Sequence, residues 1–342
     1  MARPVTQAKI PGFDRQWRGV GPHYEVWYGK VDIPDERALW FRYKTLDGAI
    51  QEASCWAVWF DGDEMIGGKK RWWLDDLDRP GPVAGREPST EVGPPLRFQG
   101  RHATFRVDDA HLDDGNALGS AGDITWDLHW RDSGRRYGFV PPILETLGLA
   151  QSTYESCFCD LRVGGRVRVG DEVVEFADAP GMVGHIQGSK IAGHSWAWSH
   201  CNNFDDDEDA VFEGLSARAL IAGRGSPLMT ALVLFVDGRR YEFHGPLQVF
   251  RTSSHFDRRI WRFSADDGEL RLTGEARAGQ ALARVRYIDT DGSDVWCSNT
   301  KLGTLELHFI DRLRGRDKTL YSSGRAAYET VTREPPIGEV LV

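Results

Sequence analysis

The sequence predicts an all-β protein built from antiparallel sheets, and three observations indicate it. Short apolar segments with period-two alternation recur along the 342 residues, and turn residues follow most of them. The chain holds 13 tryptophans and 38 glycines, a combination typical of wide sheet interiors that close through turns and bulges. Long segments with helical periodicity are missing from the sequence. Antiparallel barrels or sandwiches are therefore expected.

The expected strands follow one another from residue 24 onward. They cover residues 24–29, 38–45, 53–60, 103–107, 124–131, 166–176 (a hairpin), 212–221, 228–235, 240–243, 259–263, 269–275, 281–287, 304–310 and 324–332. Residues 53–60 are apolar throughout, which predicts a strand buried on both faces, and Asp61-Gly62 predicts the turn after it. Residues 141–149 open with two prolines and are the best candidate for a short helix.

Two groups of tryptophans suggest two domains of similar plan. The first group is Trp56, Trp59, Trp72 and Trp73, and the second is Trp196, Trp198, Trp261 and Trp296. A chain of this length also favours two domains. We expect one β-barrel over residues 1–190 and a second over residues 191–342.

Composition and charge limit the classes of partner that this protein is expected to bind. The net charge of −9 argues against nucleic acid and against an anionic membrane surface. No apolar run is long enough for an integral membrane segment, and the first 15 residues lack the apolar core of a secretory signal. Five cysteines, an odd number, fit a reducing compartment, so a cytoplasmic location is expected. Cys157 and Cys159 would share a strand face and are interpreted as small strand residues rather than metal ligands. A homodimer is left open.

The stretch from His185 to Arg218 concentrates polar and aromatic groups. Within it, His194, Trp196, Trp198 and His200 alternate with Ser195, Ala197, Ser199 and Cys201. On an extended strand the first set faces one way and the second set the other. Two indoles and two imidazoles on one face predict the wall of a pocket, with small side chains packing behind it.

Three segments carry a family resemblance. Residues 194–204 (HSWAWSHCNNF), 212–218 (FEGLSAR) and 296–307 (WCSNTKLGTLEL) resemble the tocopherol cyclase-like and carotenoid 1,2-hydratase superfamily, which includes AttH-type proteins and fungal decalin-forming Diels–Alderases. The resemblance implies two tandem lipocalin-like (calycin) antiparallel β-barrels with few short helices. It also implies a hydrophobic pocket between or inside the barrels and a polyene or isoprenoid-like ligand. The hydratases' mid-chain Asp-x-x-Trp/Gly pattern is absent at residues 184–190 (GHIQGSK).

The expected ligand-binding residues are mostly indoles. They are Trp196, Trp198, Asn202, Asn203, Trp56, Trp59, Trp261 and Trp296. A desolvated indole face stabilises a nearby cation by about 0.5–2 kcal/mol, which suits a carbocation intermediate. The two asparagines would hold a carbonyl or hydroxyl of the ligand, or else form the turn before an acidic loop at residues 205–209.

Protonating an alkene requires a shielded acid, and His194, His200 and Glu213 are the catalytic candidates. Each has an ordinary alternative: Glu213 as a partner of Arg218 or an exposed strand residue, and either histidine as a hydrogen-bonded, half-buried ring. Six strand steps separate the histidines by roughly 20 Å, so both cannot touch one reacting atom.

These residues favour a cofactor-independent cyclase, isomerase or hydratase acting on an apolar polyene, isoprenoid or prenylated molecule. The sequence lacks a dinucleotide-binding glycine motif, a phosphate loop and a closed metal-ligand set, so neither cofactor nor metal is expected. Two alternatives stay open. One is a lipocalin-type carrier or sensor of a hydrophobic small molecule, and the other is a metal enzyme using His194, His200 and a carboxylate, which their spacing disfavours.

Overall fold

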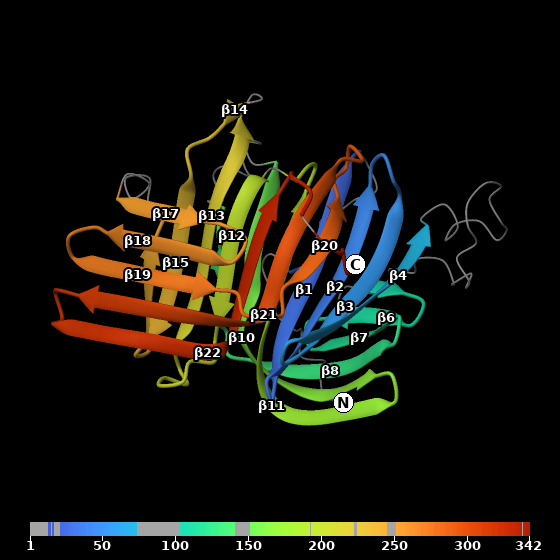
Figure 1. Cartoon of the computed structure of the whole chain (residues 1–342), viewed down its shortest axis with the longest axis horizontal. Helices are drawn as coiled ribbons and strands as arrows, with labels where there is room; N and C mark the ends of the chain where they lie inside the picture. The colour runs from blue at the N-terminus through green and yellow to red at the C-terminus, as the bar shows by residue number, and fades with distance from the viewer. Residues whose placement is uncertain are drawn as a thin grey trace, which may run out of the picture.

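The computed structural model describes residues 13–14, 16, 21–73, 103–140, 151–191, 193–221, 224–244, 251–336 and 338–342. All regular structure in these ranges is β-strand, arranged in two antiparallel sheets (Figure 1). Across the same ranges, no helix is long and apolar enough to cross a membrane.

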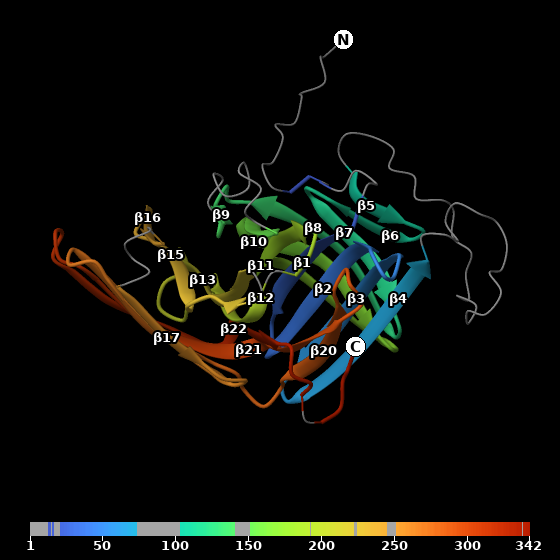
Figure 2. The ribbon, with the colours of Figure 1, turned by 90° about the horizontal axis from the view of Figure 1, so that it is seen from above.

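The first sheet contains the N-terminal half of the chain. Its strands are β1 (His23–Ile33), β2 (Arg37–Asp47), β3 (Glu52–Asp61), β4 (Glu64–Trp73), β5 (Ala103–Val107), β6 (Ala110–Asp113), β7 (Asn116–Ala121), β8 (Ile124–Asp132), β9 (Tyr137–Gly138), β10 (Ser152–Val169) and β11 (Glu172–Gly188). Their order is β4-β3-β2-β1-β11-β10-β8-β7-β6-β5, with β9 beside β10. The sheet rolls into a barrel (Figure 2). Gly68 of β4 lies so near β7 that a Cβ added to it would stand 2.0 Å from the Ala121 carbonyl oxygen, so only glycine permits this closure.

The second sheet contains the C-terminal half. Its strands are β12 (Gly193–Cys201), β13 (Val211–Ile221), β14 (Arg224–Gly225), β15 (Met229–Val236), β16 (Arg239–Phe243), β17 (Thr252–Phe256), β18 (Ile260–Asp266), β19 (Leu270–Arg277), β20 (Ala283–Ile288), β21 (Asp294–Asp311) and β22 (Arg316–Thr332). Their order is β16-β15-β13-β12-β22-β21-β19-β18-β17, with β14 beside β13 and β20 beside β21. This sheet curves more openly, as a half-barrel (Figure 2). A hydrogen bond of 2.8 Å between the hydroxyls of Ser216 and Ser254 joins β13 to β17 across it.

The predicted all-β class with two tandem lipocalin-like antiparallel units is confirmed, and the second unit, predicted as a barrel, is a half-barrel. β3 is buried from Glu52 to Phe60, as its apolar run predicted, and Asp61-Gly62 forms the turn after it. The helix expected over residues 141–149 lies outside the described residues. The chain passes from one sheet to the other between Gly188 and Gly193, and the division into domains at residue 190 stays a prediction.

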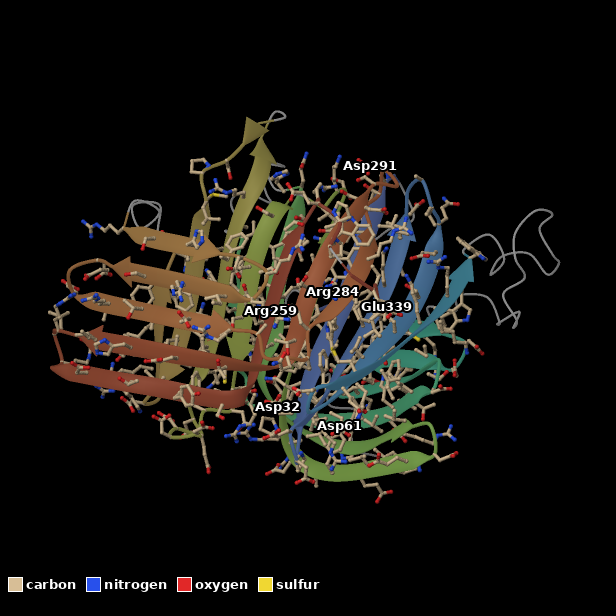
Figure 3. All side chains as sticks on the ribbon, viewed as in Figure 1. Asp32, Asp61, Arg259, Arg284, Asp291 and Glu339 are labelled. Carbon is tan, nitrogen blue, oxygen red and sulfur yellow. The ribbon has the colours of Figure 1, made fainter. Side chains whose placement is uncertain are left out.

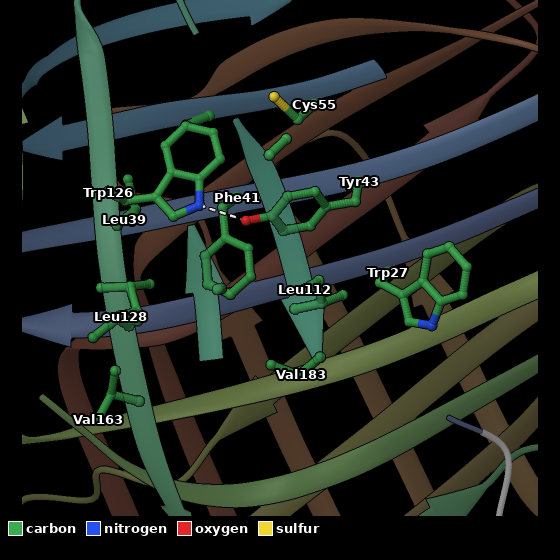
Figure 4. Close-up of a cluster of buried hydrophobic side chains, with 14 of the residues drawn as sticks. Trp27, Leu39, Phe41, Tyr43, Cys55, Leu112, Trp126, Leu128, Val163 and Val183 are labelled. Atoms are coloured by element: carbon green, nitrogen blue, oxygen red, sulfur yellow. Dashed lines mark hydrogen bonds between the residues drawn. The ribbon is translucent and has the colours of Figure 1, made fainter. Parts of the chain in front are cut away.

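Buried hydrophobic side chains form three clusters. One fills the first barrel, where the Trp126 indole donates a hydrogen bond of 2.7 Å to the Tyr43 hydroxyl (Figure 4). A second fills the inside of the half-barrel around Trp261 and Phe263. The third lies between the two sheets and draws residues from both; we call it the inter-sheet cluster. Because strand residues alternate between faces, each sheet contributes one face to its own interior and the other to this shared layer.

Candidate functional site

Strand β12 supplies the residues that carried the sequence prediction. Trp198 belongs to the inter-sheet cluster and Trp196 packs against it, whereas Ala197 and Cys201 belong to the half-barrel interior. The predicted alternation is therefore confirmed, and the aromatic face of β12 points toward the first barrel. His200 is fully buried on that face. His194, at the other end of the strand, is exposed, so the structure does not bring it to the buried group.

Strand pairing brings Glu213 to His200. In the register of β12 and β13 these two residues are direct partners, which places the Glu213 carboxylate between two same-face neighbours on β12. Its Oε1 lies 3.0 Å from His200 Nδ1, and its Oε2 accepts a hydrogen bond of 3.1 Å from the Trp198 indole. The Glu213 and His200 side chains have no solvent exposure. A cross-strand pair thus becomes a buried acid–base pair attached to an indole.

Asn202 determines which nitrogen of His200 carries a proton. Its amide nitrogen donates to the Gly181 carbonyl at 2.9 Å and to the Asp160 carboxylate at 3.3 Å. Its amide oxygen must then face His200 Nε2, 3.3 Å away, and can only accept a hydrogen bond from it. With Nε2 protonated, one proton remains to be shared between His200 Nδ1 and Glu213 Oε1. The pair is either imidazolium with carboxylate or imidazole with carboxylic acid.

A second buried ion pair lies where the two sheets meet. Lys30 Nζ is 2.9 Å from Asp32 Oδ1, and both side chains are almost completely buried. Figure 3 shows Asp32 at the junction of the two sheets. Asn203 donates a hydrogen bond of 3.4 Å to the other Asp32 oxygen. Burial raises the pKa of Asp32, and the Lys30 ammonium opposes this shift. The Lys30 ammonium also donates to the Arg325 carbonyl, which ties β1 to β22.

Lys301 of β21 ends in the inter-sheet cluster between two indoles. Its Nζ lies 4.6 Å from the centre of the Trp40 ring and 5.2 Å from that of Trp198. The side chain is 1% exposed, and its Nζ makes no hydrogen bond within the described residues. Burial lowers the pKa of Lys301 to about 7, with the Glu329 carboxylate opposing the shift. The amine therefore exchanges between its neutral and charged forms near neutral pH.

Two tyrosines face this group from the first sheet. The Tyr28 hydroxyl donates a hydrogen bond to the Tyr154 hydroxyl, and the Tyr28 ring meets the Trp198 ring edge-on at 5.8 Å. Gly184 makes room for Tyr28, because a Cβ there would lie 2.3 Å from the tyrosine oxygen. Burial raises the pKa of both phenols well above its ordinary value, so both stay protonated as donors.

Glu329 of β22 completes the polar set. Its Oε1 accepts a hydrogen bond of 3.1 Å from the Trp196 indole, and its Oε2 accepts one of 2.7 Å from the Asn299 amide. Each indole of β12 is therefore held by a carboxylate: Trp198 by Glu213 and Trp196 by Glu329. Fixed indoles present their faces in a defined direction.

The remaining predicted ligand residues are dispersed. Trp56 lies in the inter-sheet cluster, 4.5 Å from Trp40 and edge-on to it. Trp59 is in the first-barrel interior and Trp261 in the half-barrel interior, so neither faces the buried acid–base pair. Trp296 is half-buried and belongs to none of the three clusters. Only part of the predicted set is brought together.

Sequence reasoning missed Lys30, Lys301, Tyr28, Tyr154 and Glu329. A signal for them existed: each is a polar group within a strand that is otherwise largely apolar or small. Lys301 even lies inside the 296–307 segment that carried the family resemblance. What the sequence did not show was which of the two faces of each strand would meet the other sheet.

The members of the inter-sheet cluster are buried, with exposures of 0–9%. A hollow of about 310 Å³ lies elsewhere, lined by His129, Trp130, Arg131, Arg162, Gly164, Ala177 and Asp178 on β8, β10 and β11. The margin of the cluster is looser, since several hydrophobic side chains that pack against it are only half-buried. They include Tyr154, Ile186, Trp196, Leu215 and Ala231.

The two cysteines of β10 lie in different hydrophobic clusters. Cys157 is in the first-barrel interior and Cys159 in the inter-sheet cluster, because β10 shifts register around Phe158. The expectation that they share a strand face was wrong, since a bulge breaks the alternation. Over the ranges that the structure describes, no group of three His, Cys, Asp or Glu residues is placed to hold a metal.

Comparison with solved structures places this architecture among known ones. A protein provisionally named AttH from Nitrosomonas europaea aligns with a TM-score of 0.54 and 14% identity, over 97% of this chain and 98% of that one. Kievitone hydratase from Nectria haematococca aligns with a TM-score of 0.53 and 8% identity, over 96% of this chain and 94% of that one. CghA, solved with Sch210972, aligns with a TM-score of 0.55 and 10% identity, over 91% of this chain and 88% of that one. At these identities the likeness establishes the fold.

A search of curated proteins found no match. The sequence profile described as tocopherol cyclase-like matches residues 144–330, more than half of the chain. That segment includes β10 to β21 and most of β22, and with them His200, Glu213, Lys301 and Glu329. The chain therefore belongs to the tocopherol cyclase-like family.

Proposed function

We propose that this protein is an enzyme that cyclises, isomerises or hydrates an apolar, unsaturated small molecule such as a polyene or a prenylated compound. The observation that carries the proposal is the buried His200–Glu213 pair, whose Nδ1 and Oε1 atoms lie 3.0 Å apart and whose carboxylate accepts a hydrogen bond from the Trp198 indole. A buried titratable pair among aromatic faces is the arrangement that alkene protonation requires.

In this proposal each group has a defined role. The His200–Glu213 pair supplies the shared proton to a substrate double bond and recovers one when the product forms. Trp198 and Trp40 stabilise the cationic intermediate through their ring faces, by about 0.5–2 kcal/mol each. The Tyr154 hydroxyl, which accepts a hydrogen bond from Tyr28, donates one to an oxygen atom of the substrate. His194 has no role, because it is exposed at the far end of β12.

The relatives agree with an enzyme. Kievitone hydratase is named for a hydration, and CghA was solved with the small molecule Sch210972. The family is named after a cyclase. These names suggest the type of reaction and leave the substrate to experiment.

Access to the pair requires side chains to move, because neither the His200 nor the Glu213 side chain has any solvent exposure. The half-buried residues Trp196, Leu215, Tyr154 and Ile186 lie at its margin, on both sheets. We propose that substrate enters here by displacing them. Replacing Leu215 by Ala would widen this margin without touching the acid–base pair.

A carrier or sensor of a hydrophobic molecule is the alternative function. A carrier favours an apolar lining, since every unpaired polar group that it buries costs free energy without assisting chemistry. The layer between the sheets instead contains five titratable side chains: His200, Glu213, Glu329, Lys30 and Lys301. Glu329 is half-buried and accepts a hydrogen bond from Trp196, and the other four are at most 1% exposed. This distribution favours the enzyme.

The test uses a panel of acyclic polyenes and prenylated phenols incubated with the protein in D₂O. Mass spectrometry would detect isomeric products, hydrated products and deuterium incorporated at carbon. The proposal predicts deuterated product from at least one compound, with loss of this product in the Glu213→Gln variant. Compounds that bind and return unchanged and unlabelled would support the carrier instead.

A further inference from the structure

Several buried polar atoms beside the inter-sheet cluster make no hydrogen bond within the described residues, and two of them lie on β21. One is Lys301 Nζ, and the other is the amide oxygen of Asn299; both are buried and without a partner among the described residues. The orientation of Asn299 is fixed, because its amide nitrogen donates to Glu329 Oε2 at 2.7 Å. Its oxygen is therefore the atom left over.

The two unpaired atoms come from neighbouring positions on one strand. Asn299 and Lys301 are two residues apart on β21, and two strand steps advance by about 6.6 Å. Both side chains point into the layer between the sheets, since Asn299 binds Glu329 and Lys301 lies over the Trp40 and Trp198 rings. Both also adjoin Glu329, whose Oε2 accepts a hydrogen bond from Asn299 and whose charge acts on the Lys301 amine.

The protein does not satisfy these groups itself. Glu329 uses one oxygen for Trp196 and the other for Asn299, and Glu213 is divided between His200 and Trp198. The Trp40 indole nitrogen, beneath Lys301, also lacks a hydrogen-bond partner within the described part of the chain. Buried donors and acceptors are usually paired in folded proteins, so these three atoms, on Lys301, Asn299 and Trp40, have capacity to bind a ligand.

The chemistry of the unpaired atoms identifies that partner. Lys301 and Trp40 donate, and Asn299 Oδ1 accepts. A hydroxyl group meets both demands, because its oxygen accepts from nitrogen and its proton donates to an amide oxygen. A carbonyl or an ether oxygen accepts but cannot donate to Asn299. The flanking indole rings favour a flat, unsaturated group as the carrier of the hydroxyl.

We propose that Lys301 and Asn299 form a binding subsite for a phenolic or enolic hydroxyl of the substrate. The proposal rests on the function proposed above, because it places the substrate in the same layer. It assigns these residues to binding and orientation and leaves the proton transfer to His200 and Glu213. The lowered pKa of Lys301 agrees with an amine that has no partner until ligand arrives.

Calorimetric titration with matched probes tests this subsite. The probes are 2-naphthol and 2-methoxynaphthalene, which share a flat ring system and differ in the hydroxyl proton. We expect the wild-type protein to bind 2-naphthol about tenfold more tightly, the usual value of a satisfied buried hydrogen bond. Lys301→Met and Asn299→Leu each remove a polar group at nearly constant volume. Both variants should lose the preference while binding 2-methoxynaphthalene within twofold of wild type.

Lys190→Met is the matched control, because Lys190 is an exposed lysine paired with Asp291, and it should leave both affinities unchanged. If Lys301→Met does not fold, Asn299→Leu alone makes the comparison.

The outcomes separate the two proposals. Equal affinities of wild type for both probes would overturn the hydroxyl subsite and indicate that the unpaired atoms hold water. A preference that survives in both variants would overturn the assignment to these residues while leaving the proposed function standing. Failure of both probes to bind would contradict the subsite and the proposed location of the substrate together.

Discussion

The described part of the chain contains two buried histidine–glutamate pairs, at the same distance and in different surroundings. His185 Nε2 and Glu25 Oε1 are 3.0 Å apart inside the first barrel, and His200 Nδ1 and Glu213 Oε1 are 3.0 Å apart between the sheets. The His185 ring stacks on Trp27 at 4.8 Å. Glu25 also accepts a hydrogen bond of 2.6 Å from the backbone N–H of Gln16.

The second pair has different neighbours. Around His200 and Glu213 lie Trp198, the Tyr28–Tyr154 hydroxyls and the unpaired Lys301 amine, which come from both sheets. The difference teaches that a buried acid–base pair alone does not indicate a site. The barrel pair completes its hydrogen bonds with its own chain, whereas the inter-sheet pair adjoins groups that still have capacity to bind a ligand.

The largest contrast is expected from removing each carboxylate in turn. Glu213→Gln should lower turnover about 10²–10⁴-fold, because general acid–base groups contribute that much. Glu25→Gln should retain turnover and lower the melting temperature, because it loosens the contact with Gln16. Product formation by both variants, normalised to folded protein, measures the contrast. Equal losses of turnover would remove the distinction between the two pairs.

Lys301 should make stability depend on pH. Its pKa is about 7 in the folded protein and 10.5 in the unfolded chain, so the unfolded state binds more protons between these values. The free energy of unfolding should therefore rise as the pH increases from 7 to 9. Lys301→Met should stabilise the protein by a few kcal/mol at pH 7, because it removes an unpaired buried amine.

Urea denaturation at pH 7, 8 and 9 checks this prediction. Lys44, whose pKa burial also lowers to about 7, keeps part of the slope in the Lys301→Met variant. Lys44 has partners in Glu52 and the Ile288 carbonyl, so Lys44→Met should be less stabilising. An unchanged slope in Lys301→Met would mean that Lys301 is not buried as described.

Two tryptophan replacements compare the inter-sheet layer with the half-barrel interior. Trp198→Phe keeps a ring but loses the N–H bound to Glu213, and it should lower turnover about tenfold. Trp261→Phe loses a hydrogen bond to Ser254 in the half-barrel interior and should lower stability only. A greater effect of Trp261→Phe on turnover would place the substrate inside the half-barrel.

The smallest effect is expected at His194. This residue is exposed at the start of β12, away from His200, so His194→Ala should change turnover by less than twofold. Steady-state rates of the variant and wild type, measured side by side, decide the matter. A loss comparable to that of Glu213→Gln would restore the original prediction that His194 is catalytic.

The sequence was most informative where one strand shows its pattern locally. The alternation of Trp196, Ala197 and Trp198 correctly separated the two faces of β12. The apolar run of β3 predicted complete burial, and the Trp and Gly content predicted β-structure. The tandem arrangement came from the family resemblance together with the two groups of tryptophans.

The sequence could not predict which residues of different strands would meet. Glu213 was a candidate, but its pairing with His200 depends on the register of β12 and β13. Trp59 and Trp261 were expected in one ligand site and instead fill two separate interiors. Lys301 looked like an ordinary strand lysine, because its isolation among Trp40, Trp198 and Asn299 arises only when the two sheets face each other.

A crystal structure of the protein with a bound prenylated phenol, obtained by soaking or co-purification, tests the central claim most directly. We predict electron density for the ligand between the sheets, with its unsaturated chain against Trp198 and within reach of Glu213 and His200. Density inside the first barrel near Trp59, or inside the half-barrel near Trp261, would contradict the account.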